Sequence, residues 1–223
     1  MDGSTHAPPP RHPLTPDQAL EHLRRGNARW ATDEAENPRT SAERRQRTTE
    51  LGQHPLAAVL SCSDSRVPVE LVFDQGIGDL FVVRVAGNVC AEGALASLEY
   101  ALGHLAVPLL IVLGHSGCGA VAAAIAGEQA DGPLAQLLAR IQPAVEAVET
   151  HEPYLSAPRL LTAVIEANVW QALGEVLARS SAAREGIRSG ALRAVGATYD
   201  LESGRVRWLG DHPDQRQLTQ GET

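Results

Sequence analysis

The sequence predicts a single α/β domain with a mostly parallel sheet, and three observations support this fold class. The chain has 223 residues, which is enough for one sizeable α/β domain and too few for two typical ones. Helical patterns alternate with strand patterns along the chain, as in α/β proteins. Three runs are apolar on both faces, which is typical of parallel strands covered by helices; they are residues 56–61, 80–86 and 108–114.

Composition and charge exclude several function classes. The net charge is −8 with no basic run that would follow phosphates, so we expect no nucleic-acid partner. The apolar runs are too short to cross a bilayer, so we expect no membrane partner either. Residues 1–13 are polar and proline-rich and lack the apolar core of a secretory signal. They are interpreted as a disordered leader on a cytoplasmic protein.

Two helices are expected before the first strand. In residues 15–31, Thr15 can cap the helix and Pro16 suits its first position. One face of this helix is apolar and consists of Ala19, Leu20 and Leu23. That face has no obvious place in a compact sheet layer, so we expect it to clasp a second copy of the chain. A second helix is expected over residues 41–51, ending at Gly52.

The rest of the chain continues the alternation. A helix is expected between the second and third strands, at residues 92–105. Further helical segments follow the third strand, of which the longest spans residues 160–180. Residues 191–200 and 205–210 then form a strand pair joined by a turn at 202–204. The domain therefore spans residues 14–210, and residues 211–223 are interpreted as a polar C-terminal tail.

Candidate metal ligands lie at the ends of two strands. Ligands of open parallel sheets bind at the carboxyl ends of the strands. Cys62 follows the first strand, and His115 and Cys118 follow the third within GHSGCGA. If these strands are neighbours, two thiols and an imidazole converge, and this donor set suits Zn²⁺. Three protein ligands leave a fourth position open, as in catalytic zinc sites.

Simpler interpretations remain open for these residues. A buried cysteine is usually an inert small hydrophobe, and a His-x-x-Cys spacing also occurs by chance. The glycines around the histidine favour a site, because glycine allows tight turns and close approach of the backbone to a ligand; they are Gly114, Gly117 and Gly119. Cys90 has no such setting and is interpreted as a core or surface thiol. With three cysteines in the chain, a disulfide framework is not expected.

Asp64 and Arg66 lie two and four residues after Cys62, in SCSDSRVP. One interpretation is a surface ion pair that contributes little to stability. The other is that Arg66 holds Asp64 ionised and aimed at the metal. Asp64 could then orient a zinc hydroxide, or it could move onto the metal and occupy the open position.

At this point the motifs are similar to those of a known family. CSDSRVP followed downstream by GHSGCG resembles the β-class carbonic anhydrases, of the bacterial, actinobacterial type. Supporting segments are GNARW, FDQGIGDLFVVRVAGN, SLEYAL and VLGH. The resemblance runs from about residue 14 to residue 209, which is nearly the whole chain.

The resemblance implies a fold, a reaction and an assembly. The fold has four parallel strands and one antiparallel edge strand flanked by helices. Its N-terminal helices clasp a partner in a homodimer or dimer of dimers, with the site at the interface. The reaction is the reversible hydration of CO2 to bicarbonate and a proton by attack of a zinc hydroxide, with one Zn²⁺ per chain. The alternatives are hydrolysis of carbonyl sulfide or carbon disulfide on the same scaffold, and a zinc protein without turnover.

The resemblance also implies roles for single residues. Cys62, His115 and Cys118 match the zinc ligands, and Asp64 and Arg66 match the catalytic pair, with Asp64 a ligand only in a closed state. The substrate-binding positions are matched by Gln53, Phe81, Ala86, Tyr100 and Gly119. His104 matches a histidine suspected of proton shuttling, and a simple surface histidine is the other interpretation.

Two positions depart from the family pattern. Val85 stands where asparagine is usual, which removes a polar group near the site. Members regulated by bicarbonate carry a tryptophan three residues before the first cysteine, and this chain has Val59 there. Arg84 and Tyr100 match the other members of that noncatalytic bicarbonate site, so its presence in this chain stays open.

Overall fold

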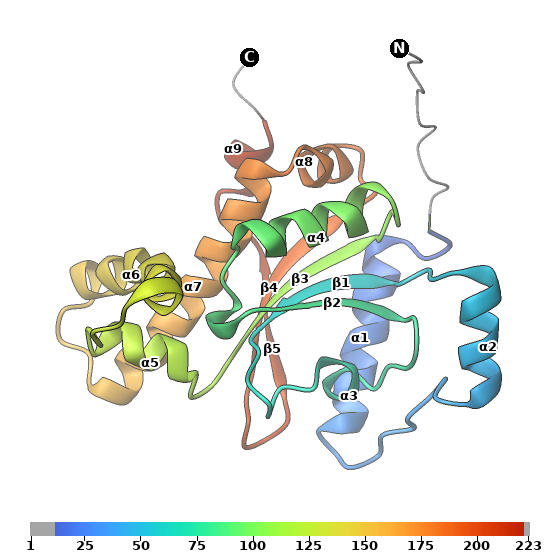
Figure 1. Cartoon of the computed structure of the whole chain (residues 1–223), viewed down its shortest axis with the longest axis horizontal. Helices are drawn as coiled ribbons and strands as arrows, with labels where there is room; N and C mark the ends of the chain where they lie inside the picture. The colour runs from blue at the N-terminus through green and yellow to red at the C-terminus, as the bar shows by residue number, and fades with distance from the viewer. Residues whose placement is uncertain (1–11, 221–223) are drawn as a thin grey trace.

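A central sheet organises the part of the chain that the computed structural model describes, residues 12–220. Within these residues the sheet has five strands in the order β2-β1-β3-β4-β5 (Figure 1). The strands are β1 (Ala57–Ser61), β2 (Leu80–Arg84), β3 (Leu109–His115), β4 (Arg193–Tyr199) and β5 (Val206–Asp211). Neighbouring strands are parallel except β4 and β5, which are antiparallel. The predicted fold class is confirmed.

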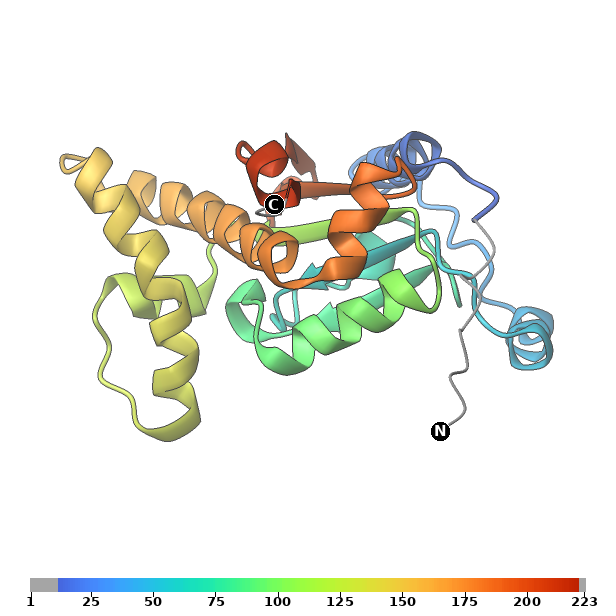
Figure 2. The same cartoon turned by 90° about the horizontal axis from the view of Figure 1, so that it is seen from above.

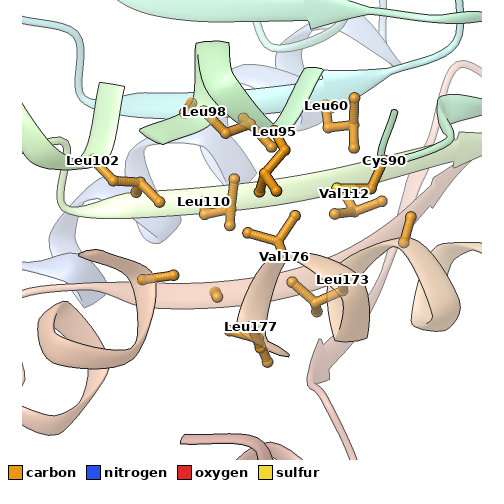
Figure 3. Packing of buried hydrophobic residues seen from close by; sticks show 14 of the residues in the cluster. Leu60, Cys90, Leu95, Leu98, Leu102, Leu110, Val112, Leu173, Val176 and Leu177 are labelled. Carbon is orange, nitrogen blue, oxygen red and sulfur yellow. The ribbon is translucent and has the colours of Figure 1, made fainter. Parts of the chain in front are cut away.

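The two faces of the sheet are covered by different helices, because successive side chains of a strand point to opposite faces. Ala58 and Leu60 of β1 pack in a core with α4 (Glu92–Gly103), α7 (Ala157–Arg179) and α8 (Ser181–Arg188). Figure 3 shows Leu60, Leu110 and Val112 of the sheet facing Leu95 and Leu98 of α4 and Leu173 and Val176 of α7. Their neighbours Ala57 and Val59 point the other way, into a second core.

Helix α1 (Pro16–Trp30) helps to form that second core together with α3 (Val69–Val72). Thr15 caps α1 in a capping box with Gln18, as its sequence predicts. The expectation that its apolar face is left for a partner is wrong. Ala19, Leu20 and Leu23 are buried inside the same chain, at 0%, 3% and 0% exposure. Helix α1 covers the face of β1 and β3 that lies opposite α4, α7 and α8. Sequence reasoning could not identify this place for the helix.

Helix α2 (Ala42–Leu51) and strand β2 form the open side of the molecule. Helix α2 stands apart from the sheet in both views (Figures 1 and 2), and none of its residues is buried among the described part of the chain. Leu51 at its end is 63% exposed. Strand β2 is an edge strand whose apolar side chains are only partly buried. The expectation that all three apolar strands are covered on both faces therefore fails for β2.

A helical lobe extends from the other side of the sheet. It consists of α5 (Gly119–Ile125), α6 (Gly132–His151) and the first turns of α7 (Figure 2). Its apolar interior also includes Cys62 and Cys118, so it closes over the candidate metal ligands. Helix α7 is long and apolar enough to cross a membrane by length and composition alone, so the expectation that every apolar run is too short is wrong for this segment. Its apolar side chains pack into two of the cores, which is typical of a buried helix in a globular domain.

The C-terminal segment is more structured than a tail. Strand β5 runs to Asp211, and the short helix α9 (Gln215–Thr219) follows and lies against α7 and α8. Thr219 is buried there. The predicted leader, residues 1–13, lies outside the described residues except for His12 and Pro13.

Candidate metal centre

The strand order brings the candidate ligands to one place. In the order 2-1-3-4-5 the chain reverses direction across the sheet between β1 and β3, and such switch points are where α/β sheets bind ligands. Cys62 is the first residue after β1, and His115 is the last residue of β3. Cys118 is the N-cap of α5. The expected convergence of two strand ends is therefore present.

The three ligand atoms form a compact, buried group. They all lie within 4.8 Å of one another, and the Sγ atoms of Cys62 and Cys118 are 4.0 Å apart. A tetrahedral zinc ion with Zn–S bonds of about 2.3 Å requires a separation of roughly 3.8 Å between its sulfur ligands. The residues are at most 4% exposed. The donor set and its spacing therefore fit a zinc ion.

The ring of His115 is oriented for metal binding. Its Nδ1 lies 2.9 Å from the carbonyl oxygen of Ser116, so the Nδ1–H tautomer can donate there and leaves the Nε2 lone pair free. Nε2 is buried and has no hydrogen-bond partner among the described residues. A buried polar atom without a partner is destabilising. A metal ion at this position would satisfy it.

The two thiols are in contact with each other. A hydrogen bond between Cys62 and Cys118 holds the pKa of Cys62 well below its ordinary value, whereas the pKa of Cys118 is raised. The pair thus releases its first proton readily. The backbone N–H of Gly87 also donates to the Sγ of Cys62, over 3.3 Å. Cys90 differs: it lies in the core beside α4, and burial raises its pKa to about 11, which agrees with an inert core thiol.

Asp64 is held beside this group by Arg66. The guanidinium donates from Nε to Oδ1 over 3.0 Å and from Nη2 to Oδ2 over 2.6 Å. The backbone N–H of Arg66 adds a third bond to Oδ1, over 2.9 Å. The side-chain hydrogen bond from Arg66 holds the pKa of Asp64 well below its usual range. Oδ2 also lies 3.9 Å from Nε2 of His115, so one ionised oxygen faces the space between the ligands.

Arg84 fixes the loop that carries these residues. It is the last residue of β2 and pairs with Ser61 across the ladder. Its Nε donates to the carbonyl oxygen of Cys62 over 3.1 Å and its Nη2 to that of Asp64 over 2.6 Å. Sequence reasoning linked Arg84 only to a bicarbonate site. In this structure its guanidinium clamps the loop between the ligand and the carboxylate.

Two of the expected substrate-binding positions lie beside the group. Ala86 is next to Gly87, in the short 3-10 helix η1 (Ala86–Asn88), and Gly119 is the first residue of α5. The first amides of a helix have no partner within it, so the Gly119 N–H is suited to an anionic oxygen. Both positions can therefore contact a molecule bound between Cys62 and Cys118.

The other expected positions lie far from the metal group of their own chain. Phe81 pairs with Ala58, four residues before Cys62, which corresponds to about 13 Å along the strand. Tyr100 packs on Phe81 with ring centroids 6.1 Å apart, and His104 stacks on Tyr100 at 5.0 Å. All three lie toward the amino end of the sheet, on the open side formed by β2.

Gln53 is farther still. Leu56 bonds to Asp79 at the start of β1, and six extended residues from there to Cys62 span about 20 Å. The three residues from Leu56 back to Gln53 reach at most about 10 Å. The side chain of Gln53 is therefore too distant to contact a molecule at the metal group of its own chain.

Sequence reasoning missed one buried polar residue near the centre. Asn168 of α7 is 1% exposed, and its Nδ2 donates to the carbonyl oxygen of Gly87 over 2.7 Å. The available signal was an amide in the mainly apolar run AVIEANVWQAL, which also contains Glu166 and Gln171. Nothing in that pattern indicates which backbone group the amide meets.

Comparisons with known proteins agree on one family. The family model for carbonic anhydrase matches residues 57–206. Carbonic anhydrase 2 of Mycobacterium tuberculosis is 40% identical over 204 residues, covering 88% of this chain and 94% of the relative. Among solved structures, a β-carbonic anhydrase of Aspergillus fumigatus has a TM-score of 0.73 at 27% identity, covering 90% of this chain and 95% of that one. A tetrameric β-carbonic anhydrase of Sordaria macrospora has a TM-score of 0.69 at 26% identity, covering 86% and 96%.

Proposed function

This chain belongs to the carbonic anhydrase family, and we propose that it catalyses the reversible hydration of CO2 with a zinc ion held by Cys62, His115 and Cys118. The family membership confirms the resemblance inferred from the motifs. The observation that carries the metal assignment is the unpartnered, buried Nε2 of His115, which lies beside the two thiols of Cys62 and Cys118.

The zinc ion would supply the nucleophile. When bound, it lowers the pKa of water from about 15.7 to roughly 7, less strongly where thiolates donate charge to it, and so provides hydroxide near neutral pH. Asp64 would accept a hydrogen bond from this nucleophile and so orient it toward the carbon of CO2. Arg66 keeps Asp64 ionised and in place through its paired hydrogen bonds.

Backbone donors complete the part of the site within one chain. The Gly119 N–H, at the start of α5, stabilises the negative charge that develops on the substrate oxygen. Ala86 gives the pocket a small apolar wall beside Cys62. Arg84 holds the carbonyl groups of Cys62 and Asp64, so that both side chains keep one orientation during the reaction.

A second copy of the chain would supply the remaining substrate contacts. Gln53, Phe81 and Tyr100 lie on the open side of β2, too far from their own metal group. On the same side, Tyr100 is 47% exposed and Leu51 63% exposed, and the apolar side chains of β2 are only partly buried. Pairing two open sides would bury this apolar surface and bring Gln53 of one copy toward the Asp64 of the other.

The assembly is therefore a homodimer or a dimer of dimers that acts on CO2 and bicarbonate in the cytoplasm. The tetrameric relative of known structure supports the larger assembly. The acidic net charge of −8 supports a protein that acts without nucleic acid.

The direct test combines metal analysis with turnover. The purified full-length chain should contain one zinc per chain and hydrate CO2 in a stopped-flow assay with a pH indicator. Release of sulfide from carbonyl sulfide, measured on the same preparation, should be much slower. Zinc at full occupancy without CO2 hydration at any pH would contradict the proposal and leave a zinc protein without turnover. Faster sulfide release than CO2 hydration would instead assign the other substrate.

A further inference from the structure

Helix α7 is fixed against the strand that carries His115. Gly114, the residue before this ligand, has no room for a side chain: a Cβ there would lie 2.7 Å from Cγ2 of Val169 and 3.3 Å from Cγ2 of Ile165. The backbone of β3 is thus in direct contact with side chains of α7, next to the metal group. The position of every residue on this part of α7 is set relative to β3, and Asn168 is the neighbour of Val169.

From that fixed position, Asn168 holds the turn η1, which follows strand β2. Its side chain is buried, and Nδ2 donates to the carbonyl oxygen of Gly87 over 2.7 Å. Gly87 lies in η1 with φ of 66°, a left-handed conformation that glycine adopts at little cost. A Cβ at this position would lie 2.8 Å from Cδ1 of Ile141. The turn is thus fixed on two sides, by a hydrogen bond and by close packing.

The same glycine contacts the metal group. The N–H of Gly87 donates to Sγ of Cys62 over 3.3 Å, a normal geometry for a hydrogen bond to sulfur. Two consecutive hydrogen bonds therefore lead from Asn168 through Gly87 to a ligand atom. The first bond uses the carbonyl of Gly87 and the second its amide, so Asn168 acts by orienting the residue.

We propose that Asn168 is a positioning residue for the metal centre, which keeps the Gly87 N–H directed at the thiolate of Cys62. This inference rests on the proposed zinc site. This hydrogen bond holds the Sγ of Cys62 in place for the metal, so its loss should weaken metal binding. It also withdraws some negative charge from the sulfur, so the bound metal would be a stronger Lewis acid. Outer contacts of this kind typically change metal affinity or activity by about 10- to 100-fold when removed.

Helix α7 also offers a matched control. Gln171 is a second carboxamide on the same helix, and its Nε2 donates to the carbonyl oxygen of Arg140 on α6. This bond joins a side chain to a backbone carbonyl, as the Asn168 bond does, but it does not involve a metal ligand. Replacing each amide by leucine therefore separates loss of a side-chain hydrogen bond to a backbone carbonyl from loss of the contact with Gly87.

The experiment uses the full chain loaded with cobalt in place of zinc. In Asn168→Leu, the sulfur-to-cobalt charge-transfer band should shift and the apparent metal dissociation constant should rise at least about tenfold. Gln171→Leu should match the wild type in both. A spectrum and an affinity within twofold of wild type for Asn168→Leu would overturn the proposal. A wild type that binds no cobalt at Cys62 would instead overturn the zinc site itself.

A second measurement covers the case in which Asn168→Leu does not fold. In wild-type protein loaded with ¹¹³Cd, the Gly87 amide proton should show scalar coupling to the metal through the N–H···S hydrogen bond. Asn168→Ser leaves a smaller polar group that cannot reach the Gly87 carbonyl, and it should reduce this coupling. Absence of coupling in the wild type, or the same coupling in Asn168→Ser, would overturn the proposal.

Discussion

One oxygen of Asp64 is shared between two neighbours: Oδ2 accepts a hydrogen bond from Nη2 of Arg66 over 2.6 Å and lies 3.9 Å from Nε2 of His115. The carboxylate therefore faces the metal group while Arg66 holds it back. Breaking the Arg66 contact would free Asp64 to approach the metal. Variants of Asp64 and Arg66 can therefore test whether this pair controls access to the fourth coordination position of the proposed zinc ion.

Replacing either member of the pair should reduce turnover and leave the metal bound. We expect Asp64→Asn to lower the rate of CO2 hydration about a hundredfold, because an amide cannot replace the ionised acceptor. Arg66→Ala should have a similar effect by releasing Asp64 onto the metal. Zinc content and stopped-flow rates check both variants, with Asp17→Asn as an exposed control. Near-normal turnover of Asp64→Asn would show that the pair does not control the site.

Activity should rise from neutral to alkaline pH. The side-chain hydrogen bond from Arg66 lowers the pKa of Asp64, so this carboxylate is already ionised throughout that range and loses its charge only in strong acid. The rise must then follow ionisation of the nucleophile and any release of Asp64 from the metal. A pH–rate profile at constant ionic strength measures it. A flat profile from neutral to alkaline pH would contradict this account.

Cys118→Ser should lose zinc and activity together, because the hydroxyl is a poor ligand compared with a thiolate. Cys90→Ala is the matched control: Cys90 is equally buried, but its thiol has a pKa raised to about 11 by burial. The control should keep one zinc per chain and near-normal turnover. Metal analysis and rates on both variants decide the assignment, and full zinc occupancy in Cys118→Ser would refute it.

The proposed sharing of each site between two copies predicts complementation. Cys118→Ser lacks the metal group but keeps Gln53, whereas Gln53→Ala keeps the metal group. Co-expressed chains should form mixed dimers in which one of the two sites has every residue, so random pairing restores about a quarter of all sites. Activity of the mixture should exceed the average of the two separate variants. Simple additivity, with mixed dimers verified by differently tagged chains, would place Gln53 outside the partner's site.

A buried acid should make stability depend on acid pH. Asp74 has a fully buried side chain, bonded to Arg29 over 2.6 Å and to the amides of Glu36 and Asn37. Burial alone would raise its pKa, but these hydrogen bonds lower it overall. A lowered pKa stabilises the fold above the unfolded value of about 3.9, and this contribution disappears as pH falls through the folded value.

Asp74→Asn should therefore lower the free energy of unfolding by about 2 kcal/mol at neutral pH. The difference from wild type should shrink below about pH 4. Urea titrations at several pH values measure it, with Asp17→Asn, whose side chain is 82% exposed, as the control. A difference that stays constant into strong acid would exclude Asp74 as the source.

Much of the centre could be predicted because its residues are local to strand ends. Cys62 and His115 follow apolar runs, and parallel strands end at one edge of a sheet, so their convergence needs no knowledge of the helices. Packing between residues far apart in the sequence could not be predicted in this way. The burial of α1 in its own chain depends on which face of the sheet is left uncovered. The contact of Asn168 with Gly87 joins residues 81 positions apart.

Other differences between the predicted and the observed structure concern where an element lies in the fold, which no local sequence pattern defines. Strand β2 is as apolar as β1 and β3, yet it lies at the edge, because strand order is set by the crossovers and not by composition. Helix α9 was missed because its residues QRQLT are mainly polar, and only the contact with α7 and α8 explains why it is helical. The distance of Gln53 from its own metal group also follows from the strand direction, not from its spacing to Cys62.

The exposed edge of β2 also affects how the protein must be made in the cell. Within the described residues β2 pairs on one side only, with β1, so a newly folded single chain presents a row of unpaired backbone donors and acceptors next to apolar side chains. Such an edge is a template for unwanted strand addition. The interval between folding and the proposed pairing of two copies is therefore the period of greatest risk of aggregation. High local concentration of newly made chains, as on one polysome, would shorten that interval.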